Sequence, residues 1–243
     1  MRSAASKNAS HAATRGALLH AAADVFAEVG FRGATVRDIC RRAGANVAAV
    51  SYHFGDKAGL YSEVLAEQSR LAQSRYPVPT GDTDPAAQLG GFIRSFLQRV
   101  LSPELHARHG RIMAREMVEP TAALDRLVAE AIRPQSEMLR EIVSALLGGA
   151  ADPARVRLCG MSVVGQILFY CHCRPVIDRL FPGAELDATG LDRLTTHITA
   201  FSLAGIRGFA ATAAPSRPGR PARTRRRADG PSASGAAKRT DRT

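Results

Sequence analysis

The stretch TVRDICRRAGANVAAVSYHFGDK, residues 35–57, predicts two short helices joined by a tight turn. The Thr35 hydroxyl can cap the amides at the start of the first helix. Gly44 is typical of a helix C-terminus, and a second helix is expected over residues 47–53. Gly55-Asp56 then ends that helix and caps the next one. The quoted stretch therefore has the pattern of a helix-turn-helix.

Helices are also predicted on both sides of this stretch. Apolar residues recur at helical spacing from Leu18 to Val29, on a helix that stops at Gly30. Downstream, a fourth helix extends through Arg75. We therefore predict a compact DNA-binding module over residues 14–62, preceded by a disordered arm over residues 1–13.

The rest of the chain is expected to be all-α as well. Alternation of β-branched residues never persists, whereas apolar residues keep helical spacing almost throughout. After a proline-rich break at 76–85, the predicted helical stretches are 89–101, 104–118, 121–147 with an interruption at Pro134, 153–174 and 191–211. We expect about nine helices in total, with a second, larger helical domain over residues 63–211.

The formal net charge of +11 is concentrated near the C-terminus. Residues 215–243 hold eight Arg and one Lys against two Asp, and residues 212–243 contain almost no large apolar group. Such a segment cannot bury enough surface to fold, so we expect a disordered Arg-rich tail over residues 212–243. It is either a solvated tail or a tether that binds DNA phosphates without sequence preference.

The remaining bulk features favour a soluble protein of the reducing cytoplasm. The four cysteines lie in helix-like apolar stretches and lack the spacing of a zinc finger or a disulfide framework. Residues 1–15 have no apolar core of a signal peptide, and the longest apolar run, residues 158–171, is too short to span a bilayer. We expect no membrane association.

The second helix of the quoted stretch has a slim leading face. A DNA major groove about 12 Å wide admits a helix only if the contacting side chains are small. The small side chains here are Val47, Ala48, Ala49 and Ser51. Donors suited to phosphate oxygens follow at Tyr52, His53 and Lys57. We therefore predict that double-stranded DNA is a partner.

Two linked patterns extend over this region. They read Phe26-x-x-x-Gly30-Phe31-x-x-x-Thr35-Val36-x-x-Ile39-x-x-x-Ala43-Gly44 and Ser51-Tyr52-His53-Phe54-Gly55-Asp56-Lys57-x-x-Leu60. Together, over residues 15–62, they resemble the tetracycline-repressor (TetR) family. Further along, Arg115-Glu116-x-x-x-Pro120-Thr121 and Gly165-Gln166-x-x-Phe169 are similar to the CecR-like branch of that family.

The resemblance implies a dimeric transcriptional regulator, a ligand-responsive repressor that binds a palindromic operator. It implies base contacts from Arg37, Asn46, Val47, Ala48 and Ser51. It implies phosphate contacts from Thr35, Tyr52, His53 and Lys57. It also makes residues 63–211 an effector-binding and dimerisation domain for an unidentified small molecule. We expect the homodimer to form through the apolar helices near 153–174 and 190–211.

The polar groups of the larger domain have two interpretations. Arg115 and Glu116 either form structural ion pairs or supply polar groups to an apolar effector cavity between helices. The candidate cavity residues are Met113, Arg115, Glu116, Gln166, Phe169 and Tyr170.

Two other motifs favour structural roles. Cys171-His172-Cys173, with His106 and His109, is compatible with a metal or thiol sensor, but Cys171 and Cys173 lie about 200° apart on a helix, which favours buried thiols. The segment 160–165 lacks the spacing and the strand of a nucleophile elbow, and its glycines instead suit a close helix approach. We expect no metal, no cofactor and no enzymatic activity. The rival classes are an architectural DNA-coating protein and, least favoured, a small helical enzyme.

Overall fold

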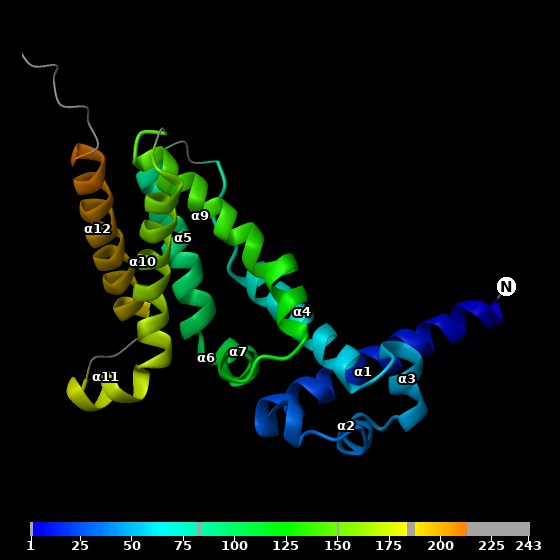
Figure 1. Cartoon of the computed structure of the whole chain (residues 1–243). Helices are drawn as coiled ribbons and strands as arrows, with labels where there is room; N and C mark the ends of the chain where they lie inside the picture. The colour runs from blue at the N-terminus through cyan, green and yellow to red at the C-terminus, as the bar shows by residue number, and fades with distance from the viewer. Residues whose placement is uncertain (1, 82–83, 150, 184–187, 213–243) are drawn as a thin grey trace, which may run out of the picture. The chain divides into compact units, whose positions relative to one another are not determined.

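The computed structural model describes residues 2–81, 84–149, 151–183 and 188–212, and every regular element in this part of the chain is helical (Figure 1). The predicted all-α class is therefore confirmed. The N-terminal elements are α1 (Arg2–Gly33), α2 (Val36–Ala43), α3 (Val47–Phe54) and α4 (Lys57–Arg75).

A longer series of helices follows. These are α5 (Pro85–Leu101), α6 (Pro103–Leu105), α7 (Arg111–Val118), α8 (Ala123–Leu127), α9 (Arg133–Leu146), α10 (Pro153–His172), α11 (Arg174–Leu180) and α12 (Ala188–Thr212), with π-helical turns η1 (His106–Gly110) and η2 (Val128–Ile132). The stretches 104–118 and 121–147 are thus divided into shorter segments, so the described residues contain more helices than the nine expected. Pro134 stands in the first turn of α9, where its missing N–H leaves no helix bond unmade.

The first helix begins earlier than expected. A disordered arm over residues 1–13 is wrong for residues 2–13, which form the first turns of α1. Half of residues 4–13 are alanine, the best helix former, and they continue directly into the amphipathic part of the helix. Gly30 has φ of +73° and interrupts the regular helix where the sequence predicts a stop, and one further turn reaches Gly33.

The N-terminal helices share a core with part of the larger domain. Leu18 and Phe26 of α1 pack with Ile39 of α2, Val50 of α3 and Leu60 of α4, each of which is almost completely buried. Ile112 of α7 and Ala123 of α8 belong to the same cluster. Apolar burial of this kind stabilises a fold by about 25 cal/mol per Å². The helix-turn-helix is therefore held on a rigid base that includes residues beyond position 62.

A second core lies among α5, α9, α10 and α12, which run alongside one another in Figure 1. Leu89, Phe92, Ile93 and Leu97 provide the α5 side of this core and are at most 2% exposed. Their i, i+3, i+4, i+8 spacing is the amphipathic pattern read from the sequence. α5 is thus the central helix of the larger domain.

Two sequence predictions concern the C-terminal tail and membrane association. Residues 213–243, nearly all of the predicted basic tail, lie outside the described residues. Within the described part, no helix on its own has the length and apolar character needed to cross a bilayer, although α10 and α11, bent by 71° at their junction, reach that length together.

Candidate nucleic-acid interface

Three residues fix the geometry of α2, α3 and the turn between them. Thr35 caps α2: its Oγ1 accepts a hydrogen bond from the Asp38 amide at 3.1 Å and donates to the Asp38 carboxylate at 2.6 Å. Gly44, in the left-handed region at φ of +63°, ends α2. Asn46 then caps α3, because its Oδ1 accepts from the Ala48 amide at 2.9 Å. The Thr35 and Gly44 caps were predicted from the sequence, whereas the Asn46 cap was not.

α3 presents one face to the core and the opposite face to solvent. Val50 is buried, whereas Val47, Ala48, Ser51 and Tyr52 are exposed. The exposed positions recur at i, i+1, i+4 and i+5, so they share one side of the helix. This side is slim apart from Tyr52, as entry into a major groove requires.

The predicted base-contacting residues all lie on the surface. Arg37 on α2 and Asn46, Val47, Ala48 and Ser51 at the start of α3 are exposed. α2 and α3 pack against each other, so Arg37 belongs to the same small module as the exposed face of α3. The structure therefore brings this set together on two adjoining helices.

The predicted phosphate-contacting residues are less uniform. Thr35 and Tyr52 are exposed, whereas His53 and Lys57 are half-buried. The Lys57 ammonium donates hydrogen bonds of 3.0 Å to the carbonyl oxygens of Phe31 and Ala34. An ammonium has three N–H donors, so one donor remains for a phosphate. Lys57 thus also ties the start of α4 to the end of α1 and to Ala34, which follows it.

His11 is a surface residue of this region that the sequence did not reveal. Its ring centre lies 5.5 Å from that of Tyr52 and 6.1 Å from that of His53, both in edge-on arrangements. His11 lies in the segment expected to be disordered. The alanine content of residues 4–13 was the signal that would have extended α1 to it.

Ion pairs hold the outer surface of α2. Arg42 forms two hydrogen bonds, of 2.7 and 3.0 Å, with the Glu28 carboxylate on α1. These bonds hold the pKa of Glu28 below its usual value. The Thr35 hydroxyl and then Arg41 lower the pKa of Asp38 in the same way. Both carboxyl groups are therefore charged at neutral pH. Arg37 lies on the same surface but belongs to neither of these ion pairs.

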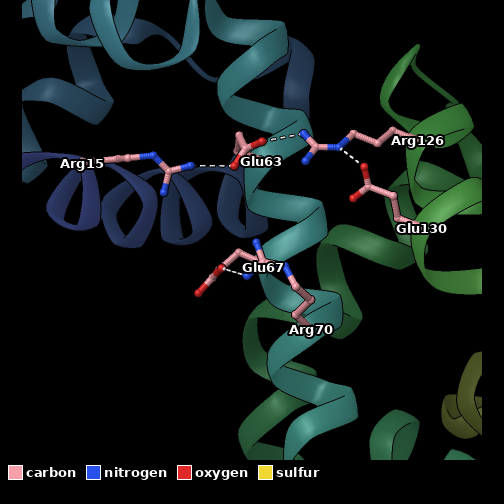
Figure 2. Close-up of polar contacts among 6 residues, drawn as sticks. All are labelled: Arg15, Glu63, Glu67, Arg70, Arg126 and Glu130. Carbon is pink, nitrogen blue, oxygen red and sulfur yellow. Dashed lines mark hydrogen bonds and ion pairs between the residues drawn. The ribbon is translucent and has the colours of Figure 1, made fainter. Parts of the chain in front are cut away.

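Glu63 on α4 links the DNA-binding module to the larger domain. Figure 2 shows its carboxylate between Arg15 of α1, at 2.7 Å, and Arg126 of α8. Arg126 in turn pairs with Glu130. The Arg126 hydrogen bond is the main reason that the pKa of Glu63 lies below its usual value. Glu63 is therefore an anionic bridge between α1 and α8.

A second link is fully buried. The Tyr61 hydroxyl on α4 donates a hydrogen bond of 2.9 Å to the Glu116 carboxylate on α7. The other carboxylate oxygen accepts from the Thr121 amide at 2.8 Å and from its hydroxyl at 3.0 Å. Burial, followed by the Glu116 hydrogen bond, raises the pKa of Tyr61. Glu116 has a structural role here, which is one of its two predicted interpretations.

The six candidate effector-pocket residues do not share one cavity. Arg115 lines a cavity of about 600 Å³ beside Gly30, Tyr61 and Pro120, and its Nη2 donates a hydrogen bond of 3.0 Å to the Glu28 carbonyl oxygen. Met113 packs against the core of the N-terminal module. A separate hollow of about 350 Å³ is lined by Gln166, Phe169 and Tyr170. The prediction of a single pocket is wrong, because α7 and α10 contribute to different cores.

The Cys171-His172-Cys173 motif lies at the C-terminal end of α10. Cys171 donates a hydrogen bond to the Val100 carbonyl oxygen at 3.8 Å, and burial raises the pKa of its thiol. In the part of the chain that the structure describes, no three His, Cys, Asp or Glu side chains gather as a metal-binding group.

Two family models match the chain. The model described as "Bacterial regulatory proteins, tetR family" matches residues 18–64. The model described as "HTH-type transcriptional dual regulator CecR, C-terminal domain" matches residues 85–206, about half of the chain. The chain belongs to the TetR family. It is a DNA-binding transcriptional regulator with α2 and α3 as its helix-turn-helix.

Individual relatives agree with this membership. The chain is 28% identical over 164 residues to the HTH-type transcriptional dual regulator CecR of Shigella flexneri, covering 63% of this chain and 73% of CecR. It is 32% identical over 185 residues to an HTH-type transcriptional repressor of Mycobacterium tuberculosis, covering 74% and 79% of the two chains. Both relatives carry names of transcriptional regulators.

Solved structures support the fold. A transcriptional regulator from Rhodococcus matches with a TM-score of 0.57 and 23% identity over 79% of this chain and 96% of that chain. The hemolysin II transcriptional regulator HlyIIR matches with a TM-score of 0.52 and 20% identity over 78% and 98% of the two chains.

Proposed function

We propose that this TetR-family protein is a ligand-responsive repressor that binds a palindromic operator as a homodimer. The observation that carries the proposal is the exposed, slim face of α3, held by the Thr35, Gly44 and Asn46 caps at the surface of the N-terminal module. Such a face fits a major groove, and a two-fold dimer reads two successive grooves about 34–36 Å apart.

Within this function, Arg37 is the residue that sets base preference. Its guanidinium can donate two hydrogen bonds to guanine, whereas Val47 and Ala48 pack on thymine methyl groups. Asn46 Oδ1 is engaged in the α3 cap, so its amide N–H groups are the donors for a base edge. Phosphate contacts come from Thr35, Tyr52, His53 and the remaining Lys57 donor.

The dimer interface is assigned to α10 and α12. Large apolar side chains on these helices are at least half exposed: Leu158, Met161, Phe169, Phe201 and Phe209. A side chain added at Gly165, Gly205 or Gly208 would meet no atom within 4 Å, so this surface leaves room for close approach of another helix. Exposed apolar surface of this extent is typical of an interaction site. A second copy packing there would form a four-helix interface.

Effector control requires a connection between the two domains. Glu63 and the Tyr61–Glu116 hydrogen bond join α4, and through it the helix-turn-helix, to α7 and α8. A ligand that favours a different arrangement of the larger domain would change the separation of the two α3 helices. The ligand must bind the two arrangements unequally, since equal affinity shifts nothing.

Footprinting of the protein on the DNA upstream of its own gene tests the function. A discrete two-fold footprint is expected. The variant Arg37→Ala should then lose about 1–3 kcal/mol of discrimination against a substituted guanine. Arg32→Ala is the matched control, because it removes the same positive charge from a side chain that pairs with Glu119 of the larger domain. Equal losses on operator and random DNA for Arg37→Ala would refute the base contact.

The dimer is tested separately. Phe201→Asp places a charge on a side chain that is 64% exposed, so the isolated fold should tolerate it. We expect a monomer by analytical ultracentrifugation and a loss of operator affinity. Val118→Asp, at an exposed site on α7, should remain dimeric. Dimeric Phe201→Asp would exclude this interface, and uniform coating of DNA in the footprint would exclude a sequence-specific repressor.

A further inference from the structure

Among the residues that the structure describes, Arg99 on α5 is a buried cation with no acidic partner. Only 6% of the residue is exposed. Its Nε donates a hydrogen bond of 3.3 Å to the Ser95 carbonyl oxygen of the same helix, and the guanidinium lies 5.3 Å from the centre of the Phe96 ring. Among the described residues, its Nη2 has no hydrogen-bond partner. Burial lowers the pKa of Arg99 to about 10, so the group is still a cation at neutral pH.

His109 is a second polar group of interest, and it lies in the π-helical turn η1, which packs against α5. Its Nδ1 is buried and has no hydrogen-bond partner in the part of the chain that the structure describes. Burial, and then the charge of Arg99, lower the pKa of His109 to about 4. The imidazole is therefore neutral at pH 7, and Nδ1 donates a hydrogen bond in the tautomer that carries its proton there.

Leaving these two groups unpaired is costly for the fold. An uncompensated buried charge is strongly destabilising, and buried polar atoms almost always have partners. Neither group is explained by the packing of the helices. π-helical turns such as η1 are rare and occur frequently at functional sites. An anion bound beside Arg99 would compensate its charge and accept hydrogen bonds from both groups.

We propose that Arg99 and His109 anchor the effector of this regulator and that the effector is an amphipathic monocarboxylate, an inference that rests on the ligand-responsive function proposed above. One guanidinium balances one negative charge, and its planar N–H groups match the two oxygens of a carboxylate. The side chains around Arg99 favour a ligand whose remaining part is apolar. Phe96 lies against the guanidinium, and Phe92, two turns earlier on the same face of α5, is buried.

The position of η1 explains how such a ligand reaches the DNA-binding module. η1 packs against α1 and α4 as well as α5. Arg108, the neighbour of His109, forms an ion pair of 2.6 Å with Asp24 on α1. A carboxylate that draws His109 toward Arg99 changes the position of η1, and the Arg108–Asp24 pair transmits this change to the helix that supports α2 and α3.

The test uses the full-length protein and calorimetric unfolding, which suits a chain without tryptophan. The probes are octanoate, decanoate and benzoate, each compared with its primary amide at the same ionic strength. The amides keep the apolar body but carry no charge. We expect at least one carboxylate to raise Tm by about 5–10 °C at a concentration near 100 Kd, and its amide to have a much smaller effect.

Variants assign the effect to the site. Arg99→Met removes the charge at similar length and should weaken carboxylate binding at least tenfold while raising the Tm of the free protein. A purely structural Arg99 would instead lower that Tm. Arg99→Lys keeps the charge without the planar fork and should bind with intermediate affinity. Arg94→Met, on the exposed side of α5, is the matched control and should bind normally.

Three results would overturn the inference: no carboxylate raises Tm, the amides act equally, or Arg99→Met keeps the full response. Operator binding is measured separately, with and without the active carboxylate. Binding at Arg99 without a change in operator affinity would overturn the regulatory role. A protein that binds no operator at all contradicts the proposed function instead, and the Tm series still decides whether the anion site exists.

Discussion

Replacing Tyr61 with Phe removes a single oxygen atom from the buried contact between α4 and α7. Tyr61 and Glu116 are 3% and 0% exposed, and their hydrogen bond is 2.9 Å long. The substitution leaves no cavity, so the loss is that of one hydrogen bond to a charged acceptor, about 1.5–3 kcal/mol. For a chain of this size each kcal/mol shifts Tm by about 2–4 °C. We therefore expect Tm to fall by about 3–12 °C.

Thermal and urea unfolding measure this effect. Tyr170→Phe, which removes the same atom from a half-buried tyrosine on α10, is the matched control and should change Tm little. Glu116→Ala should cost more than Tyr61→Phe, about 3–5 kcal/mol, because the Thr121 amide also loses its acceptor. If Tyr61→Phe unfolds within 1 °C of the natural protein, the Tyr61–Glu116 bond does not hold α4 to α7.

Three further predictions concern the same junction and the core beside it. Gly30→Ala should lose about 1–3 kcal/mol in urea denaturation, because φ is +73° and the added Cβ would lie 2.8 Å from Arg115 Nη1; unchanged stability would contradict this geometry. Glu63→Gln should cost about 1 kcal/mol at pH 7, since the ion pairs are partly exposed. The pKa of Glu63 is lowered from 4.5, so this difference should shrink as the pH falls below 4.5 and be lost once the pH is below the lowered pKa, and a gap that acid leaves unchanged would argue against the ion pair. The His109 imidazole, with a pKa of about 4 instead of 6.5, resists protonation in the folded state; stability should decline as pH falls from 6.5, by about 2 kcal/mol at pH 5, and His109→Gln should remove this decline.

The helix-turn-helix could be predicted from the sequence because its determinants are local. Thr35, Gly44 and Gly55 act within a few residues along the chain, and the apolar spacing of α1 to α4 reports which face is buried. The exposed positions on α3 follow from the same periodicity. The early start of α1 was also local information, carried by alanines, but the polar residues among them favoured a disordered arm.

The candidate effector pocket could not be predicted in the same way. Periodicity shows that a helix has a buried face, but it does not show which other helix covers that face. Arg115 and Gln166 are both polar residues among apolar ones, and the structure places them beside different cavities. The sequence motif that suggested one pocket therefore joined two separate regions.

The sequence by itself determined the helical class, the helix-turn-helix and the face that it offers to DNA, because these depend on hydrogen bonds and side-chain spacing within single turns of helix. Only the tertiary structure decided the partners of Glu63 and Glu116 and the burial of Arg99. Glu63 meets Arg15 and Arg126 across 48 and 63 residues of chain, and Tyr61 meets Glu116 across 55. Such pairings are set by how whole helices pack, and the same packing brings α5, which carries Arg99, against η1, which carries His109.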